Sequence, residues 1–366
     1  MELQKKRYLS LDIFRGLDIA LMIIVNSPGK GATTFAPLLH AKWHGFTLTD
    51  LVFPTFLFIV GNSISLSMTK YNNLTDKVFL TKVLNRTSIL FLLGFLMYWF
   101  PFFENGSLKP LSDTRIFGVL QRIALCYFFG AIILRFWKTK GVLIFSVIGL
   151  VGYQLLLFAF GDLTLEGNAV LKLDNWLIGA NHMYHGDGIA FDPEGLLSTL
   201  PAIVNVIGGY MAGSFLQKSG QNYNTILKMT LVGIALIVTA VVWDAYFPIN
   251  KKLWTSSFVL LTIGLDLIIL SILVYVLDIL KKTKWTFFFD VLGKNPLFIY
   301  LLSELLVITL YQFTIAGVSS YDWIAEHVFV STLGDYLGSL GFAVSILLSC
   351  WIVGYFLNRK KIYIKI

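Results

Sequence analysis

The sequence predicts an all-α polytopic membrane protein, a bundle of about ten transmembrane helices with both termini in the cytoplasm. Of its 366 residues, 56% are hydrophobic and 14% are charged, and the mean hydropathy is +0.74. Soluble domains are typically about 45–50% apolar and about 25% charged. The apolar runs are continuous rather than alternating, which argues against a membrane β-barrel.

Ten apolar spans can be recognised, each near the roughly 20 residues that a membrane helix needs. They cover residues 10–26, 47–69, 86–103, 116–136, 141–161, 195–217, 225–247, 253–279, 294–314 and 335–357. Residues 285–291 precede the ninth span and are a candidate for a separate interfacial segment. We predict one integral-membrane domain over residues 1–366, with a first half (1–161), an outer loop (162–194) and a second half (195–366). No internal repeat of the inverted-topology transporter type is evident.

The basic residues predict the orientation. With the N-terminus inside and alternating spans, inside segments carry 19 Lys and Arg and outside loops carry 7. Cytoplasmic loops are enriched in these residues, so both termini are expected inside. The net charge of +8 resides in short loops, and we predict no nucleic-acid partner. No signal-peptide cleavage site follows the basic start, so the first span is expected to stay.

Charged residues inside the spans are the first candidates for function, because each costs about 2.5–3.5 kcal/mol on insertion scales and usually faces a cavity or the bundle interior. Asp12, Arg15 and Asp18 lie near one face of the first span. They form either a self-neutralising structural cluster or the polar wall of an inward-facing cavity. Arg122 and Lys294 also have structural interpretations, but with Arg15 they favour a buried anionic ligand.

The outer loops 27–46 and 162–194 contain four of the five histidines, His40, His44, His182 and His185. Imidazole suits proton transfer near neutral pH. Asp50 follows at the start of the second span, where a helix N-terminal role is the simpler interpretation. His40 with His44, or His182 and His185 with Asp187, offer metal-ligand spacings, but no third ligand is enforced, and we predict no metal.

Several segments resemble known membrane acyltransferases. The run Tyr8-Leu-Ser-Leu-Asp-Ile-Phe-Arg-Gly16 is similar to the opening of that superfamily. More specific segments resemble the heparan-α-glucosaminide N-acetyltransferase family: Val25-Asn26, His40-Ala-Lys-Trp-His-Gly-Phe-Thr-Leu-Thr-Asp-Leu-Val-Phe-Pro54, Gly118-Val-Leu-Gln-Arg122, Phe191-Asp-Pro-Glu-Gly195, Gly293-Lys-Asn-Pro-Leu297 and the tail from Lys360 to Lys365. The chain looks like a short bacterial version without the extra lumenal portion of eukaryotic members.

The resemblance implies an enzyme that takes acetyl-CoA from the cytosolic side and acetylates the amine of a terminal glucosamine on the other side. It implies that His40 is the catalytic histidine and that Asn26 belongs to the same site. His44 departs from the eukaryotic pattern, which has Asn there, and this bears on the acceptor contacts. His40 acts either as a general base or as an acetylated nucleophile, and both mechanisms stay open.

The resulting predictions place the active-site mouth at the periplasmic face of the inner membrane. We expect His40 and Asn26 to be catalytic, and acetyl-CoA, as cosubstrate, to lie among the first, second, fourth and ninth spans in a cavity that opens inward. The expected CoA-binding residues are Arg15, Arg122, Lys294 and Asn295. The expected acceptor-binding residues are His44, Asp50, His182, His185, Asp187 and Asp192, the last two in an acidic outer lip.

Rival functions remain at this point. A secondary transporter of amino sugars has a similar composition, and an O-acetyltransferase of an envelope glycan would share the site. The expected partners are acetyl-CoA, an amino-sugar or glycan acceptor and the lipid bilayer, and a homodimer is left open.

Overall fold

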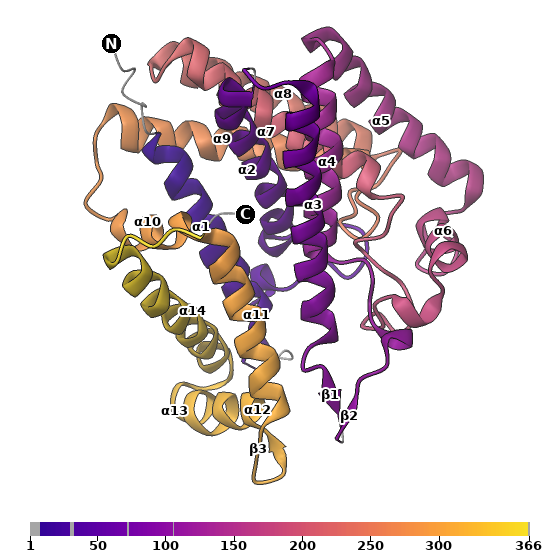
Figure 1. Cartoon of the computed structure of the whole chain (residues 1–366), viewed down its shortest axis with the longest axis vertical. Helices are drawn as coiled ribbons and strands as arrows, with labels where there is room; N and C mark the ends of the chain where they lie inside the picture. Colours follow the sequence, from indigo (N-terminus) through magenta and orange to yellow (C-terminus); the bar gives the residue numbers. More distant parts are fainter. Residues whose placement is uncertain (1–7, 30–32, 72, 105, 365–366) are drawn as a thin grey trace.

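The computed structural model describes residues 8–29, 33–71, 73–104 and 106–364. These residues are predominantly helical with only two short hairpins, which confirms the predicted fold class (Figure 1). The basic start over residues 1–7 and Lys365 lie outside the described residues. The α-helices are α1 (Leu9–Asn26), α2 (Leu48–Tyr71), α3 (Asp76–Trp99), α4 (Val119–Phe136), α5 (Thr139–Phe160), α6 (Ala169–Leu177), α7 (Thr199–Ser219), α8 (Tyr223–Asp244), α9 (Ser256–Leu273), α10 (Phe287–Lys294), α11 (Pro296–Gln312), α12 (Ser320–Ile324), α13 (Ser331–Leu333) and α14 (Asp335–Arg359).

Short elements connect the long helices. Two antiparallel hairpins pair β1 (Phe103–Glu104) with β2 (Ser107–Leu108) and β3 (Thr314–Ile315) with β4 (Val318–Ser319). The remaining helical turns are η2 (Ala36–Leu38), η3 (Leu111–Asp113), η4 (Ala180–His182) and the π-helices η5 (Val274–Ile279) and η6 (Ala325–Val330).

Each predicted span corresponds to a helix, and the number of helices able to cross a membrane by length and composition is close to the predicted number of about ten. Within the described residues, eight helices are long and apolar enough, or nine if α10 and α11 form one span bent by 87°. Helix α1 is not among them, because its 18 residues include three charges. The segment expected around residues 285–291 is confirmed as α10, which ends before the helix-starting Pro296. Helix α3 starts at Asp76, ten residues before the predicted start of this span. Its first turns are polar, so the apolar run that predicts the span begins later than the helix.

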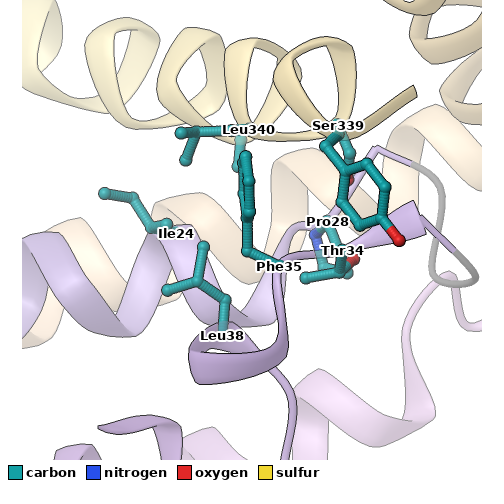
Figure 2. A pocket seen from close by; sticks show the side chains of 9 residues that line it. Ile24, Pro28, Thr34, Phe35, Leu38, Ser339 and Leu340 are labelled. Carbon is teal, nitrogen blue, oxygen red and sulfur yellow. The ribbon is translucent and has the colours of Figure 1, made fainter. Parts of the chain in front are cut away.

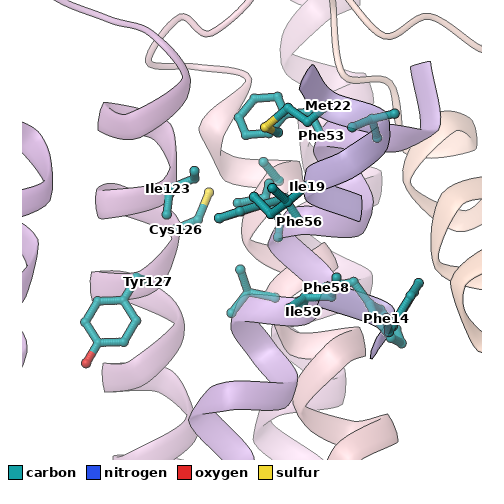
Figure 3. Packing of buried hydrophobic residues seen from close by; sticks show 14 of the residues in the cluster. Phe14, Ile19, Met22, Phe53, Phe56, Phe58, Ile59, Ile123, Cys126 and Tyr127 are labelled. Carbon is teal, nitrogen blue, oxygen red and sulfur yellow. The ribbon is translucent and has the colours of Figure 1, made fainter. Parts of the chain in front are cut away.

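The core forms around α2, in whose central stretch 78% of the residues are buried, against 22% in the peripheral α8. Aromatic and aliphatic side chains from α1, α2 and α4 meet there, among them Phe14, Phe58 and Ile123 (Figure 3). Peripheral helices instead expose apolar side chains such as Val147 of α5. This distribution is expected of a bundle whose outer surface faces lipid.

Glycines let neighbouring helices approach closely. A Cβ atom on Gly61 of α2 would lie 1.9 Å from the carbonyl oxygen of Val206 of α7, and one on Gly209 would lie 1.8 Å from that of Phe58. Gly16 of α1 meets the carbonyl oxygen of Phe289 of α10 in the same way, at 1.9 Å. Small residues commonly form such contacts in membrane bundles. They fix α2 against α7 and α1 against α10, and thereby the helices that carry the polar residues described next.

Candidate active site

His40 and Asp50 form the centre of the site. His40 Nδ1 lies 2.7 Å from Asp50 Oδ1, and the Asp50 side chain is buried whereas that of His40 is 45% exposed. The other carboxylate oxygen of Asp50 accepts hydrogen bonds from the backbone N–H of Ala41 at 3.1 Å and from the backbone N–H and hydroxyl of Thr47, both at 3.0 Å. An ionised carboxylate only accepts, so it holds the proton on Nδ1 and leaves the lone pair on Nε2.

Lys251 completes this centre from the turn between α8 and α9. Its Nζ lies 3.2 Å from both ring nitrogens of His40. Burial lowers the pKa of the Lys251 ammonium, and the nearby carboxylates of Glu194 and Asp50 partly offset this effect. Lys251 is not among the residues predicted from the sequence, where a basic pair in an outside loop is the available signal. A cation beside an imidazole with a free lone pair is an arrangement that can stabilise an oxyanion during acyl transfer.

The turn that carries Lys251 is held in place by Asn250. The backbone N–H of Leu253 donates to Asn250 Oδ1 at 2.8 Å, and the Asn250 amide lies 3.3 Å from His44 Nδ1. The backbone N–H of Gly45 donates to the carbonyl of Ile249 at 2.8 Å. His44 therefore joins the two loops. Residues 39–47 are not helical, so His44 does not share a helix face with His40, and burial lowers the pKa of His44 against the opposing charge of Asp244.

The loop before His40 is anchored by apolar packing. Phe35 and Leu38 of the η2 region line a cleft together with Ile24 of α1 and Leu340 of α14 (Figure 2). Its volume of about 10 Å³ is roughly that of one water molecule, so the cleft fixes the loop rather than binding a ligand. On the other side, Trp43 Nε1 donates to the carbonyl of Leu163 at 2.7 Å.

The outer loop packs next to this centre, as predicted, but its acids are paired. Asp187 bonds to Lys252, and Asp192 accepts two hydrogen bonds from Arg115, at 2.9 and 2.7 Å. Glu194 accepts from the same guanidinium at 2.6 Å. His182 Nδ1 lies 2.8 Å from the carbonyl oxygen of Thr114, and His185 is exposed. The two acids of the expected lip, Asp187 and Asp192, thus each have a cationic partner within the chain.

Asn26 is the last residue of α1, and its partner is Glu304 of α11. The Asn26 amide donates to Glu304 Oε1 at 3.2 Å. Glu304 lies within electrostatic range of Tyr98, whose hydroxyl accepts from Arg115 Nη1 at 3.2 Å. The Arg115 guanidinium is packed between the rings of Tyr98 and Tyr184, at 4.9 and 5.0 Å from their centroids.

Arg15 and Lys294 meet at the opposite end of the bundle, around α10. Arg15 Nη1 lies 3.6 Å from Asp12 and donates to the carbonyl of Gly293 at 3.2 Å, and Nη2 donates to Ser63 at 3.3 Å. The 13 positions between Asp50 and Ser63 on α2 correspond to about 20 Å at 1.5 Å per residue. The structure thus describes two polar sites at different depths: the His40 site and the Arg15 site.

The other predicted CoA-binding residues beside the Arg15 site already have partners. Lys294 lies 2.5 Å from Asp290 and donates to Asn358 at 3.1 Å. Asn295 donates to the carbonyl of Ile362 at 3.1 Å and accepts from the backbone N–H of Ile364 at 2.8 Å. The C-terminal segment at Ile362 and Ile364 therefore lies next to the end of α10, against which α1 also packs.

Arg86, which the sequence analysis missed, also lies near the Arg15 site. It acts electrostatically on Arg15, its Nε is buried without a hydrogen-bond partner, and its guanidinium lies 4.7 Å from the Tyr127 ring centroid. The next residues of α3 line an open groove of about 460 Å³: Thr87, Ser88, Phe91, Leu92 and Phe95. Residues three or four apart share a helix face, so this face runs from Thr87, directly after Arg86, past Phe91 and Phe95 towards Tyr98.

Arg122 does not join Arg15 and Lys294. It is fully buried in the first turn of α4, where Nη2 donates to the carbonyl of Gly195 at 3.0 Å and to the Ser198 hydroxyl. Its guanidinium lies 4.8 Å from the Trp254 ring centroid. This position is on the His40 side, because α4 starts where α3 and the Arg115 segment end. Among the described residues, no three His, Cys, Asp or Glu side chains come together as a candidate metal site.

Comparison with known proteins covers nearly the whole chain, and a family model covers its first half. Residues 7–174 match the model of the family described as heparan-alpha-glucosaminide N-acetyltransferase, catalytic. The family resemblance is confirmed. The heparan-alpha-glucosaminide N-acetyltransferase of Mus musculus is 30% identical over 97% of this chain, and that of Homo sapiens is 29% identical over 98%. The chain spans 60% of the length of either relative. The matched region contains Asn26, His40 and Asp50, whereas Lys251 and Glu304 follow it.

Proposed function

We propose that this protein is a transmembrane N-acetyltransferase, which moves the acetyl group of cytoplasmic acetyl-CoA to the amine of a glucosamine-type sugar at the periplasmic face of the inner membrane. The observation that carries the proposal is the His40–Asp50 pair, in which a buried carboxylate holds Nδ1 and leaves Nε2 accessible. Relatives named as N-acetyltransferases support the reaction class. The orientation follows from the excess of basic residues in alternate loops.

Acetyl-CoA binding is proposed to connect the two polar sites. Arg15 and Arg86 supply cationic groups for phosphates, which a planar guanidinium can bind through two oxygens at once. The groove along α3 then provides an apolar path for the pantetheine arm past Phe91 and Phe95 towards the His40 site. Arg122 has no part in this path, because its guanidinium is buried against Gly195 and Ser198.

In the chemical step, the neutral amine attacks the thioester carbonyl while His40 Nε2 accepts the proton from nitrogen. The tetrahedral intermediate collapses when the C–S bond breaks, and the same proton passes to the CoA sulfur. Lys251 is the proposed donor to the oxyanion, since its ammonium stands 3.2 Å from His40 and electrostatic stabilisation of this charge is usually the largest catalytic contribution. A mechanism through acetylated His40 uses the same residues and remains an alternative.

The test is acetyl transfer by the purified protein in detergent. Release of CoA thiol from acetyl-CoA should depend on glucosamine, and mass spectrometry should find N-acetylglucosamine. His40→Ala should reduce the rate by about 10²–10⁴-fold while acetyl-CoA still binds. Preference for a glycan hydroxyl over the amine would favour the O-acetyltransferase. Glucosamine uptake into proteoliposomes without acetyl transfer would favour the transporter and overturn the proposal.

A further inference from the structure

The acids of the His40 site differ in how their charge is balanced. Asp50 is bonded to His40, Asp187 to Lys252, and Asp192 and Glu194 to Arg115. Glu304 has no such cation: among the described residues, its one hydrogen-bond partner is the neutral amide of Asn26, and no Lys or Arg forms an ion pair with it. Its side chain is only partly buried and the neighbouring Asn26 is exposed, so a ligand can reach the pair.

The surroundings of Glu304 place this carboxylate on the same network as His40. Glu304 acts electrostatically on Tyr98 and on Tyr300 of its own helix. Tyr98 contacts Arg115, Arg115 contacts Glu194, and Glu194 acts on Lys251 beside His40. This series of hydrogen bonds and longer-range charge interactions runs from α11 through α3 to the turn before α9.

We propose that Glu304, held by Asn26, binds the protonated amine of the acceptor. The identity of the amine as an amino sugar rests on the proposed function. A carboxylate without a cationic partner in a membrane bundle is stabilised by a bound ammonium. Asp187 and Asp192 already have cationic partners, and each would have to give up its own cation in order to bind the ammonium of the acceptor. The acceptor-binding acid is therefore on α11 and not in the outer loop.

The position also accounts for the protons of the reaction. An ammonium must lose two protons to become an amide. Glu304 takes the first, which frees the nitrogen lone pair, and releases it to water on the exposed side of Asn26. His40 accepts the second as the N–C bond forms and returns it to the CoA sulfur as the C–S bond breaks. The products are the amide, the CoA thiol and one released proton.

Isothermal titration with two sugars tests the subsite without turnover. Glucosamine carries the charge, and N-acetylglucosamine is its uncharged counterpart. The wild type should bind glucosamine at least about tenfold more tightly, which is the range expected for a hydrogen bond to a charged group. Glu304→Gln should remove this preference by raising the glucosamine Kd about tenfold, with little change for N-acetylglucosamine or acetyl-CoA. Glu304→Asp, which keeps the charge, should retain part of the preference.

Glu166→Gln is the matched control, because the same chemical change is made at an exposed residue of the outer loop. It should keep the wild-type preference. Equal Kd values for the two sugars in the wild type overturn the subsite, whatever the fate of the variants, and so does a folded Glu304→Gln protein with the wild-type preference. Loss of the preference in Glu304→Gln, in a protein that transfers no acetyl group, would support the subsite and refute the acetyltransferase.

Discussion

Lys251 Nζ lies 3.2 Å from both Nδ1 and Nε2 of His40, although 211 positions separate the two residues in the sequence. Since Asp50 already occupies Nδ1 at 2.7 Å, Nε2 is the nitrogen left for the substrate, and a group that reacts there comes within reach of the ammonium. A substrate carbonyl entering this space exchanges one hydrogen-bond partner of Lys251 for another. The arrangement gives Lys251 a role that is distinct from proton transfer.

Replacing Lys251 with Met should lower kcat by about 10²–10³-fold, because one donor to the oxyanion is lost. The KM values for acetyl-CoA and glucosamine should change little, since the contact strengthens only in the transition state. Lys251→Arg should recover part of the rate. Lys172→Met, at a residue whose ammonium bonds to the carbonyl of Phe160 in the outer loop, is the control expected to keep wild-type kinetics. A Lys251→Met enzyme with normal kcat would exclude the oxyanion role.

Replacing Asp50 with Asn should lower kcat by about 10²–10⁴-fold with acetyl-CoA affinity retained. An amide can present its NH2 to Nδ1 of His40, and the ring then takes the tautomer that carries its proton on Nε2. His44→Ala should have a smaller effect, because His44 contacts Asn250 instead of His40. Steady-state kinetics of both variants, with thermal melts to verify folding, provide the comparison. Asp50→Asn activity above that of His44→Ala would show that Asp50 only caps α2.

The sequence could predict the His40 site in part. The helical spans follow from continuous apolar runs. Asp50 lies in the first turn of α2 and accepts hydrogen bonds from the loop just before it, so its contact with His40 is local in sequence. Lys251 and Glu304 reach the site only through the packing of α9 and α11, which no local pattern specifies. The paired state of Asp187 and Asp192 depends likewise on Lys252 and Arg115, which come from other loops.

Arg122 illustrates a different difficulty. Arg15, Arg122 and Lys294 form one predicted group because each is a cation in an apolar span, but charge alone does not indicate the depth of a residue in the membrane. Spans alternate in direction, so the first turn of α4 and the first turns of α1 lie at opposite ends of the bundle. The direction of the spans is therefore enough to place Arg122 and Arg15 at opposite ends of the bundle, without knowledge of the structure. The buried hydrogen bond to Ser198 gives Arg122 a structural role.

Replacing Arg122 with Ala should destabilise the protein by about 3 kcal/mol, since a fully buried side chain is lost together with its hydrogen bonds to Gly195 and Ser198, and a cavity is left in its place. Folded Arg122→Ala protein should bind acetyl-CoA like the wild type. Arg15→Gln should show the converse, with a Kd for acetyl-CoA raised about tenfold and a smaller loss of melting temperature than Arg122→Ala, because the Arg15 side chain is partly exposed. Thermal melts and titration of both variants with acetyl-CoA distinguish the two roles. Weakened acetyl-CoA binding by folded Arg122→Ala, with normal binding by Arg15→Gln, would reverse the assignment.

Asp174 should make the stability of the outer loop depend on pH. Its carboxyl is buried in α6, where one oxygen accepts from the backbone N–H of Leu196 at 3.0 Å and the other has no hydrogen-bond partner. Burial raises the pKa of Asp174 from 3.8 to about 7, with Asp192 adding to the rise and the Leu196 N–H and Arg122 opposing it.

The pKa of Asp174 is higher in the folded protein than in the unfolded chain. At a pH between these two pKa values, the folded protein therefore keeps a proton that the unfolded chain has released. Stability therefore falls as pH rises from about 4 to about 7, by up to about 1.4 kcal/mol per pH unit, and is constant on either side. Asp174→Asn mimics the neutral carboxyl. Relative to wild type, the variant should gain melting temperature between pH 5 and pH 8, whereas Glu166→Gln should follow the wild type at every pH. Parallel melting curves for wild type and Asp174→Asn across this range would show that the Asp174 carboxyl is ionised in the folded protein.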